Sequence, residues 1–273
     1  MPESKTLTHI NQLLDIMEKL RDPNGGCPWD LEQNFDTIAP HTIEEAYEVA
    51  EAIAKGDMAE LKDELGDLMF QVVFYAQMAK EAGDFDFNDV IEAISEKMIR
   101  RHPHVFGNKD IATAEAQTTA WEETKARERA EKQAASNQPP SALDGVAGNL
   151  PALTRAVKLQ NRAGRVGFDW PSILPVFEKI EEEMAELRAE IDKNANEDRI
   201  AEEYGDLLFV IANLGRHLKL EPETVLRTAN RKFTRRFQTV EQRLNARGKP
   251  IDQCSLEEMD EVWNEIRKED KSQ

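Results

Sequence analysis

An internal repeat constrains this 273-residue chain more than any other feature of its sequence. Three blocks of the first half, Ile43–Glu48, Glu64–Phe70 and Lys97–Arg101, recur as Glu181–Glu186, Glu203–Phe209 and Lys232–Arg236. The blocks keep one order in both halves, and a tryptophan, Trp29 or Trp170, precedes each set. Because such a match is hard to obtain by chance, we predict a tandem duplication of one structural unit.

Hydrophobic spacing assigns the repeated unit to the all-α class. One face of a first predicted helix carries Leu7, Ile10, Leu14, Met17 and Leu20. Thr42 and Glu45 have the spacing of a capping box, so a second helix is predicted to begin at Thr42 and to end before Gly56. Further helices are predicted over 58–80 and 88–101, and no run of alternating strand residues occurs in the sequence.

A change in composition near the middle of the chain predicts a linker. Residues 125–149 begin with a polar, alanine-rich stretch, and Pro139-Pro140-Ser141 ends any helix within them. We therefore predict an N-terminal domain over 1–124, a linker over 125–149 and a C-terminal domain over 150–273.

Charge and cysteine content exclude several classes of protein. The chain has 53 acidic and 35 basic residues, a net charge of −18, which argues against binding a nucleic-acid polymer or an anionic membrane surface. No apolar run approaches the ~18–20 residues of a membrane span, and the first residues lack a secretory pattern. Cys27 and Cys254 form no CxxC or zinc spacing, so a reducing, cytoplasmic setting is predicted.

Acidic side chains line one face of a helix in each half. This face carries Glu44, Glu45, Glu48 and Glu51 in the first half and Glu178, Glu182, Glu186 and Glu190 in the second. Like charges at i,i+4 cost roughly 0.2–0.5 kcal/mol per pair. For an isolated helix such a stripe is usually a solvated face, but a cation against it would also offset the cost.

A second acidic pair in each half favours a bound cation over a solvated face. Glu64 and Asp67, and likewise Glu203 and Asp206, are one turn apart within strongly apolar helices, where an unpaired charge is costly. The mid-helix glycines Gly66 and Gly205 predict close helix approach. Two acidic helices facing each other would gather four or five carboxylate oxygens. Such oxygen sites select hard cations, of which Mg²⁺ also bridges to substrate phosphates.

Histidine positions argue against two competing metal chemistries. A di-iron bundle needs Glu-x-x-His on its helices, but the residues three after the candidate glutamates are Tyr47, Glu51, Asp67, Ala185 and Asp206. None of the five histidines is placed as a ligand, which also disfavours a His-Asp metal phosphohydrolase.

A basic block complements the acidic sites. Lys232, Arg235 and Arg236 lie at i, i+3 and i+4 and therefore share one helix face. Such a face either forms surface ion pairs with acidic helices or binds the oxygens of a polyphosphate. In the first half Lys97, Arg100 and Arg101 repeat the block.

These motifs together resemble the MazG family of the all-α NTP pyrophosphatase superfamily. The signature of that superfamily is Glu-Glu-x-x-Glu, a spacer, and Glu-x-x-Asp. Both halves carry it, as Glu44, Glu45, Glu48, Glu64 and Asp67 and as Glu182, Glu183, Glu186, Glu203 and Asp206. The likeness spans about residues 7–265 and includes the flanking loops around Trp29, His102 and Trp170.

The resemblance implies tandem four-helix-bundle-like domains, a homodimer, and Mg²⁺-dependent hydrolysis of NTPs and dNTPs to the monophosphate and pyrophosphate. The implied metal ligands are Glu182, Glu183, Glu186, Glu203 and Asp206, with the first-half signature as their counterpart. Lys232, Arg235 and Arg236 would bind phosphate. In the family, carboxylates also orient the water that attacks the α-phosphorus, and which of them acts as general base stays open.

Two further residues are candidates for substrate contact, each with an alternative. Arg199 would add a phosphate contact or be an ordinary exposed helical arginine, and Trp263 would stack on a base or dock the last helix. The second half is favoured as the catalytic one, because Pro103 interrupts the basic helix of the first half just after Arg101.

Two other functions stay open. One is a non-enzymatic regulatory dimer that binds Mg²⁺ or nucleotide. The other is a narrower pyrophosphatase acting on dUTP or modified nucleotides.

Overall fold

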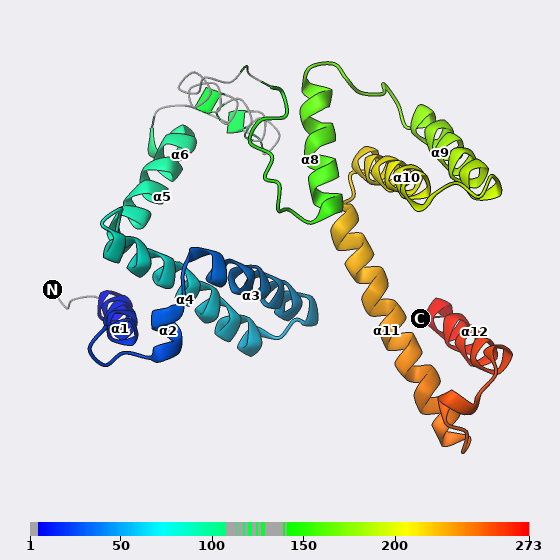
Figure 1. The fold of residues 1–273 in the computed structure, drawn as a ribbon, viewed down its shortest axis with the longest axis horizontal. Helices are drawn as coiled ribbons and strands as arrows, with labels where there is room; N and C mark the ends of the chain where they lie inside the picture. Colours follow the sequence, from blue (N-terminus) through cyan, green and yellow to red (C-terminus); the bar gives the residue numbers. More distant parts are fainter. Residues whose placement is uncertain are drawn as a thin grey trace. The chain divides into compact units, whose positions relative to one another are not determined.

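The computed structural model describes residues 5–107 and 141–272, together with positions 113, 117, 120, 121, 124, 127, 128 and 139. Across these residues all regular secondary structure is helical and no strand occurs, which confirms the all-α prediction. The chain divides into two compact units, Met1–Lys125 and Ala126–Gln273 (Figure 1), and each is described by itself. Much of the predicted linker 125–149 lies outside the described residues.

The first unit is built around one long helix. Its elements are α1 (Lys5–Leu20), α2 (Pro28–Glu32), α3 (Phe35–Lys55), α4 (Met58–Ala82), α5 (Phe87–Arg101) and α6 (Pro103–Phe106). Helix α4 packs against α3, α1 and α5. Met17, Ile38, Val73 and Phe74 are almost completely buried where these helices meet. The α3–α4 pair therefore forms a rigid base for the acidic side chains that both helices carry.

Helix α3 begins seven residues earlier than predicted. The cap is Asn34, whose side chain accepts from the backbone of Asp36 and Thr37, while the Thr37 hydroxyl accepts from the backbone of Asn34. This reciprocal cap and the burial of Ile38 hold the helix together although Pro40 lies inside it. The predicted cap at Thr42 was wrong. The predicted end was right, because Gly56 takes a left-handed φ of 71° that terminates α3.

The second unit repeats the arrangement of the first. Its elements are α8 (Ala152–Arg165), α9 (Leu174–Asp192), α10 (Glu197–His217), α11 (Pro222–Ala246), the 3₁₀ turn η1 (Ile251–Gln253) and α12 (Leu256–Ser272). Helix α10 packs against α9 and α8, as α4 packs against α3 and α1. Helices α11 and α12 pack against each other around a core of Val240, Leu244, Val262 and Ile266, and α11 also contacts α8 and α10.

The structure does not bear out the close helix approach predicted at the two mid-helix glycines. A Cβ atom built on Gly66 or Gly205 meets no atom within 4 Å. Exposed apolar side chains lie beside both, Leu65 in α4 and Tyr204 and Leu208 in α10. In the described chain these glycines therefore lie on open, partly apolar helix surfaces. No helix there has the length and hydropathy needed to cross a membrane.

Candidate metal and nucleotide site

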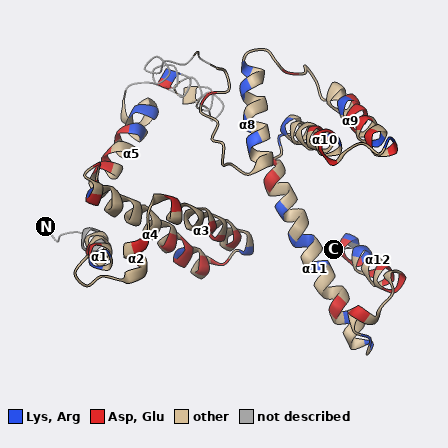
Figure 2. Ribbon diagram, viewed as in Figure 1, with Lys and Arg blue, Asp and Glu red and all other residues tan. Residues whose placement is uncertain are grey.

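Each unit brings three carboxylates together from its two paired acidic helices. The first triad comprises Glu45 and Glu48 of α3 and Glu64 of α4, and the second comprises Glu183 of α9 and Glu203 and Asp206 of α10. Within each triad one oxygen of every carboxylate lies within 4.8 Å of the others. Figure 2 shows acidic residues gathered along α3, α4, α9 and α10. An all-oxygen set of this kind suits a hard divalent cation.

The four remaining predicted ligands lie at the margins of the triads. Glu44 is exposed and its carboxylate is 3.6 Å from His41 Nδ1, while Glu182 pairs with Lys179. Asp67 and Glu186 stay near enough to raise the pKa values of a triad member in their own unit. The structure therefore separates a compact inner set from side chains that lie around it.

The first triad is a concentration of uncompensated negative charge. Burial raises the pKa of Glu45, and the neighbouring carboxylates of Asp67 and Glu48 raise it further. Burial and the carboxylates of Glu48 and Asp67 raise the pKa of Glu64 in the same way. Among the described residues, no lysine or arginine forms an ion pair with a member of this triad. The first triad therefore favours protonation or a cation over three bare carboxylates.

The second triad has two basic partners. Lys179 Nζ lies 2.7 Å from Glu183 Oε1 and 2.9 Å from Glu182 Oε1, and Arg199 Nη2 donates to Glu203 Oε1 at 2.9 Å. The bond to Glu183 is the main reason that the pKa of Lys179 is raised. Burial still raises the pKa of Glu203, although Arg199 opposes this effect.

One oxygen in the second triad is left without a partner. The Glu183 side chain is only 6% exposed, and while its Oε1 pairs with Lys179, its buried Oε2 has no hydrogen-bond partner. A buried acceptor without a partner costs stability, and a cation among the three carboxylates would satisfy it. The donor set and this orphaned oxygen both fit a bound divalent cation.

The two halves of the chain differ at the positions of these two basic residues. In the register of the repeat, His41 occupies the position of Lys179 and Glu60 that of Arg199. Arg199 was among the predicted substrate contacts, but Lys179 was missed, because it lies outside the carboxylate signature and next to an acidic helix face, where a lysine is an ordinary surface partner. Aligning the repeats around the signature, and not only within it, would have singled it out.

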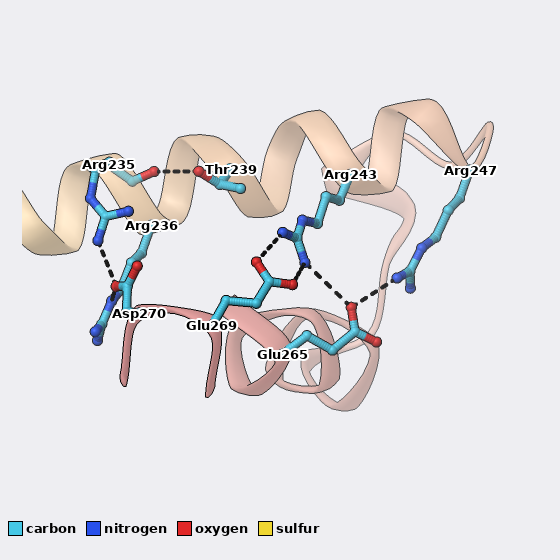
Figure 3. A network of polar contacts seen from close by, with 8 residues as sticks. All are labelled: Arg235, Arg236, Thr239, Arg243, Arg247, Glu265, Glu269 and Asp270. Atoms are coloured by element: carbon cyan, nitrogen blue, oxygen red, sulfur yellow. Dashed lines mark hydrogen bonds and ion pairs between the residues drawn. The ribbon is translucent and has the colours of Figure 1, made fainter. Parts of the chain in front are cut away.

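The predicted phosphate-binding block lies on the α11–α12 pair. Arg235 and Arg236 both donate to Asp270 of α12 (Figure 3), and the Arg236 guanidinium lies 5.8 Å from the ring centre of Trp263. Lys232 is exposed on the same helix. The structure thus joins Arg236 and Trp263, which were predicted separately. Both arginines form their ion pairs with Asp270 of α12.

The pairing of arginine with tryptophan occurs in both units. The Arg101 guanidinium lies 5.0 Å from the ring centre of Trp121, just as Arg236 lies over Trp263. Trp121 and Trp263 are each followed two residues later by a glutamate and four residues later by a lysine or arginine. This fourth repeated block was missed, since its first copy lies next to the predicted linker.

The fold and the triads together define a class: a duplicated all-α protein whose paired helices carry carboxylate sites suited to a divalent cation. Comparison with known families is more specific. Residues 33–106 and 173–241 match the MazG nucleotide pyrophosphohydrolase domain. The chain therefore belongs to the MazG family, and the two matched segments confirm the tandem duplication.

Two relatives that match over nearly their full length agree with this assignment. The nucleoside triphosphate pyrophosphohydrolase of Escherichia coli strain K12 is 49% identical over 265 residues, which cover 97% of this chain and 99% of that protein. The nucleoside triphosphate pyrophosphohydrolase/pyrophosphatase MazG of Thermotoga maritima is 42% identical over 259 residues, 94% of this chain and 95% of that protein. YabN of Bacillus subtilis is 40% identical over 97% of this chain, which matches 53% of that longer protein.

Proposed function

We propose that the chain hydrolyses NTPs and dNTPs to the nucleoside monophosphate and pyrophosphate, with Mg²⁺, at the triad of the second unit. Nucleotide pyrophosphohydrolysis is the activity for which the family is named. The observation that carries the choice of site is the orphaned, buried Oε2 of Glu183 within a triad flanked by Lys179 and Arg199.

The second triad would hold the cation through Glu183, Glu203 and Asp206, with Glu182 and Glu186 close by. Bound Mg²⁺ supplies Lewis-acid polarisation of a phosphate oxygen. The remaining steps belong to the side chains of the protein. A carboxylate of the set orients the attacking water and accepts its proton, a task for which a raised pKa, as at Glu203, is favourable.

Basic side chains would bind the phosphates. With a cation bound by Glu183 and Glu203, Lys179 and Arg199 would each lose one carboxylate partner, while Glu182 and Glu202 stay beside them, and the freed N–H donors would be available to phosphate oxygens beside the triad. Lys232, Arg235 and Arg236 supply a second cationic surface, and Trp263 beside Arg236 offers a ring on which any base can stack. Stacking of this kind supports loose base selectivity.

The first triad is proposed not to be the hydrolytic centre. It offers carboxylates to a cation, but His41 and Glu60 replace the two basic residues that flank the second triad. Where the second unit presents Arg199 to a phosphate, the first presents Glu60, a carboxylate that pairs with Lys55 at 2.9 Å. This difference supports the second unit independently of the proline that interrupts the first basic helix.

We also propose a homodimer, as the resemblance implies. Apolar side chains are exposed along both acidic helix pairs, including Ile43, Tyr47 and Met69 in the first unit and Phe177 and Phe209 in the second. Such surfaces suit association with a second copy.

The test is a substrate panel combined with matched variants of the two triads. Each common NTP and dNTP, with dUTP and modified nucleotides, is supplied with and without Mg²⁺, and the products are separated. Glu203→Gln with Asp206→Asn should abolish release of monophosphate and pyrophosphate, and Glu64→Gln with Asp67→Asn should retain it. Orthophosphate as first product would refute the chemistry, and activity surviving in the first variant would refute the site. Nucleotide binding without turnover would indicate a regulatory dimer. Turnover of one nucleotide alone would indicate a narrower pyrophosphatase.

A further inference from the structure

We infer that Asp270, near the end of α12, is a positioning residue that fixes the Arg236 guanidinium for the nucleotide phosphates. The inference rests on the proposed function, in which Arg236 contacts phosphate. It adds a residue outside the signature, outside the triads and outside the basic block of the repeat. Asp270 touches neither the proposed cation ligands nor, on this account, the substrate.

The geometry joins one carboxylate oxygen to two guanidiniums. Asp270 Oδ2 accepts from Arg236 Nε at 2.7 Å and from Arg235 Nη2 at 2.5 Å (Figure 3). The side chains of Arg236 and Asp270 are 15% and 19% exposed, whereas that of Arg235 is 58% exposed. The pair of Arg236 with Asp270 is thus the shielded one, and Arg235 reaches it from the solvent side.

The bond at Nε leaves the rest of the Arg236 guanidinium available. Its two Nη groups carry four N–H donors, which can take two oxygens of one phosphate. On the other side the guanidinium lies 5.8 Å from the centre of the Trp263 ring, which is also in contact with Phe233. Arg236 is therefore held between a carboxylate and an aromatic ring before any nucleotide arrives.

Holding the arginine in advance lowers the cost of binding. A free arginine loses much rotamer entropy when it binds a phosphate, and a preorganised one loses less. The carboxylate also offsets repulsion between two neighbouring guanidiniums that would otherwise separate. The hydrogen bonds from Arg235 and Arg236 keep the pKa of Asp270 below its usual value, so the carboxylate is charged at neutral pH.

The competing explanation is that Asp270 only docks α12 onto α11. Docking does not depend on this residue alone. Arg243 donates to both oxygens of Glu269 at 3.0 and 2.6 Å, and Arg247 donates to Glu265 at 3.1 Å. The apolar core between the helices adds to these pairs. Glu269 therefore provides a matched control: the neighbouring residue, on the same helix, with an ion pair to α11, but away from Arg236.

The experiment compares Asp270→Asn with Glu269→Gln in the full chain. Steady-state hydrolysis of ATP with Mg²⁺ gives KM and kcat. Calorimetric titration with a non-hydrolysable α,β-substituted ATP analogue gives Kd. Asp270→Asn should raise KM and the analogue Kd by about tenfold, with kcat changed by less than about threefold. Glu269→Gln should leave KM, Kd and kcat within about twofold of the parent. Circular dichroism of both variants should match that of the parent.

Coupling to Arg236 separates this inference from the proposed function. Arg236→Gln should itself raise KM, and adding Asp270→Asn to it should have no further effect. If Arg236→Gln leaves KM unchanged, the phosphate role fails and the inference fails with it. If Arg236→Gln raises KM but Asp270→Asn does not, only the inference is overturned. Tighter binding by Asp270→Asn, or an equal effect of Glu269→Gln, would also overturn it.

Discussion

Replacing Lys179 by methionine should destabilise the second unit only while no divalent cation is bound. In the described structure Lys179 is the cationic partner of Glu183, whose side chain is 6% exposed. Methionine keeps most of the apolar stem but removes the charge. Glu183 would then be buried with neither oxygen paired. A cation in the triad satisfies the same carboxylate and makes the lysine unnecessary for stability.

The size of the effect follows from the burial of the pair. Removing one partner of a fully buried ion pair costs about 3–5 kcal/mol. Lys179 is 31% exposed, so water reaches the pair, and the expected loss falls to roughly 1–3 kcal/mol. The second bond of Lys179, to the half-exposed Glu182, adds little. For a unit of this size the loss corresponds to a Tm lower by about 3–9 °C.

The assay is thermal unfolding of parent and variant in EDTA and in a series of Mg²⁺ concentrations. In EDTA the variant should unfold at the lower temperature, and saturating Mg²⁺ should remove most of the difference. Lys193→Met is the control, because Lys193 is the C-cap residue of the same helix and pairs with Glu190 at 3.3 Å but is 68% exposed. It should shift Tm little, and equally in both conditions. A Lys179→Met deficit that Mg²⁺ leaves unchanged would refute the reasoning.

Two other predictions concern stability. Gly205→Ala should raise the unfolding free energy by roughly 0.5–1 kcal/mol in chemical denaturation, because the added Cβ meets no atom within 4 Å; a loss would show that another chain packs there. Asp169→Asn should lower the unfolding free energy at pH 7 by about 1–2 kcal/mol, because hydrogen bonds from Arg216 depress the pKa of Asp169. A carboxyl group whose pKa is lowered in the folded state stabilises the protein only while it is ionised. The unfolding free energies of parent and variant should therefore converge below about pH 4. A difference that stays constant with pH would contradict the assignment.

The fold was largely predictable because its determinants are local and repeated. The spacing of apolar residues placed the helices, and duplicated blocks showed that the same unit occurs twice. The start of α3 was missed for a physical reason: Pro40 discourages a helix in the sequence, but the cap at Asn34 and the burial of Ile38 outweigh it. The capping bond is local, whereas the burial depends on helices far away in the sequence.

The candidate site was predicted by residue type but not by arrangement. Helical spacing identified the two acidic faces, yet it could not show that Glu183 belongs to the inner set and Glu182 does not, although both pair with Lys179. Which face of α9 meets α10 is decided by packing between helices. The prediction of close approach at Gly205 failed similarly, since a helical glycine indicates only that a side chain is absent.

The net charge of −18 says less about function than the way in which basic residues are paired with the two triads. A site made only of carboxylates attracts a cation, but its own side chains add no hydrogen-bond donor for a polyphosphate. A site whose carboxylates are paired with Lys179 and Arg199 holds its own counter-ions, and under the proposed function a cation that replaced them would leave N–H donors for the phosphates. Cation and nucleotide binding then reinforce each other. If the second unit is the hydrolytic one, as proposed, the two positions of the repeat that His41 and Glu60 occupy in the first unit distinguish the roles of the two units.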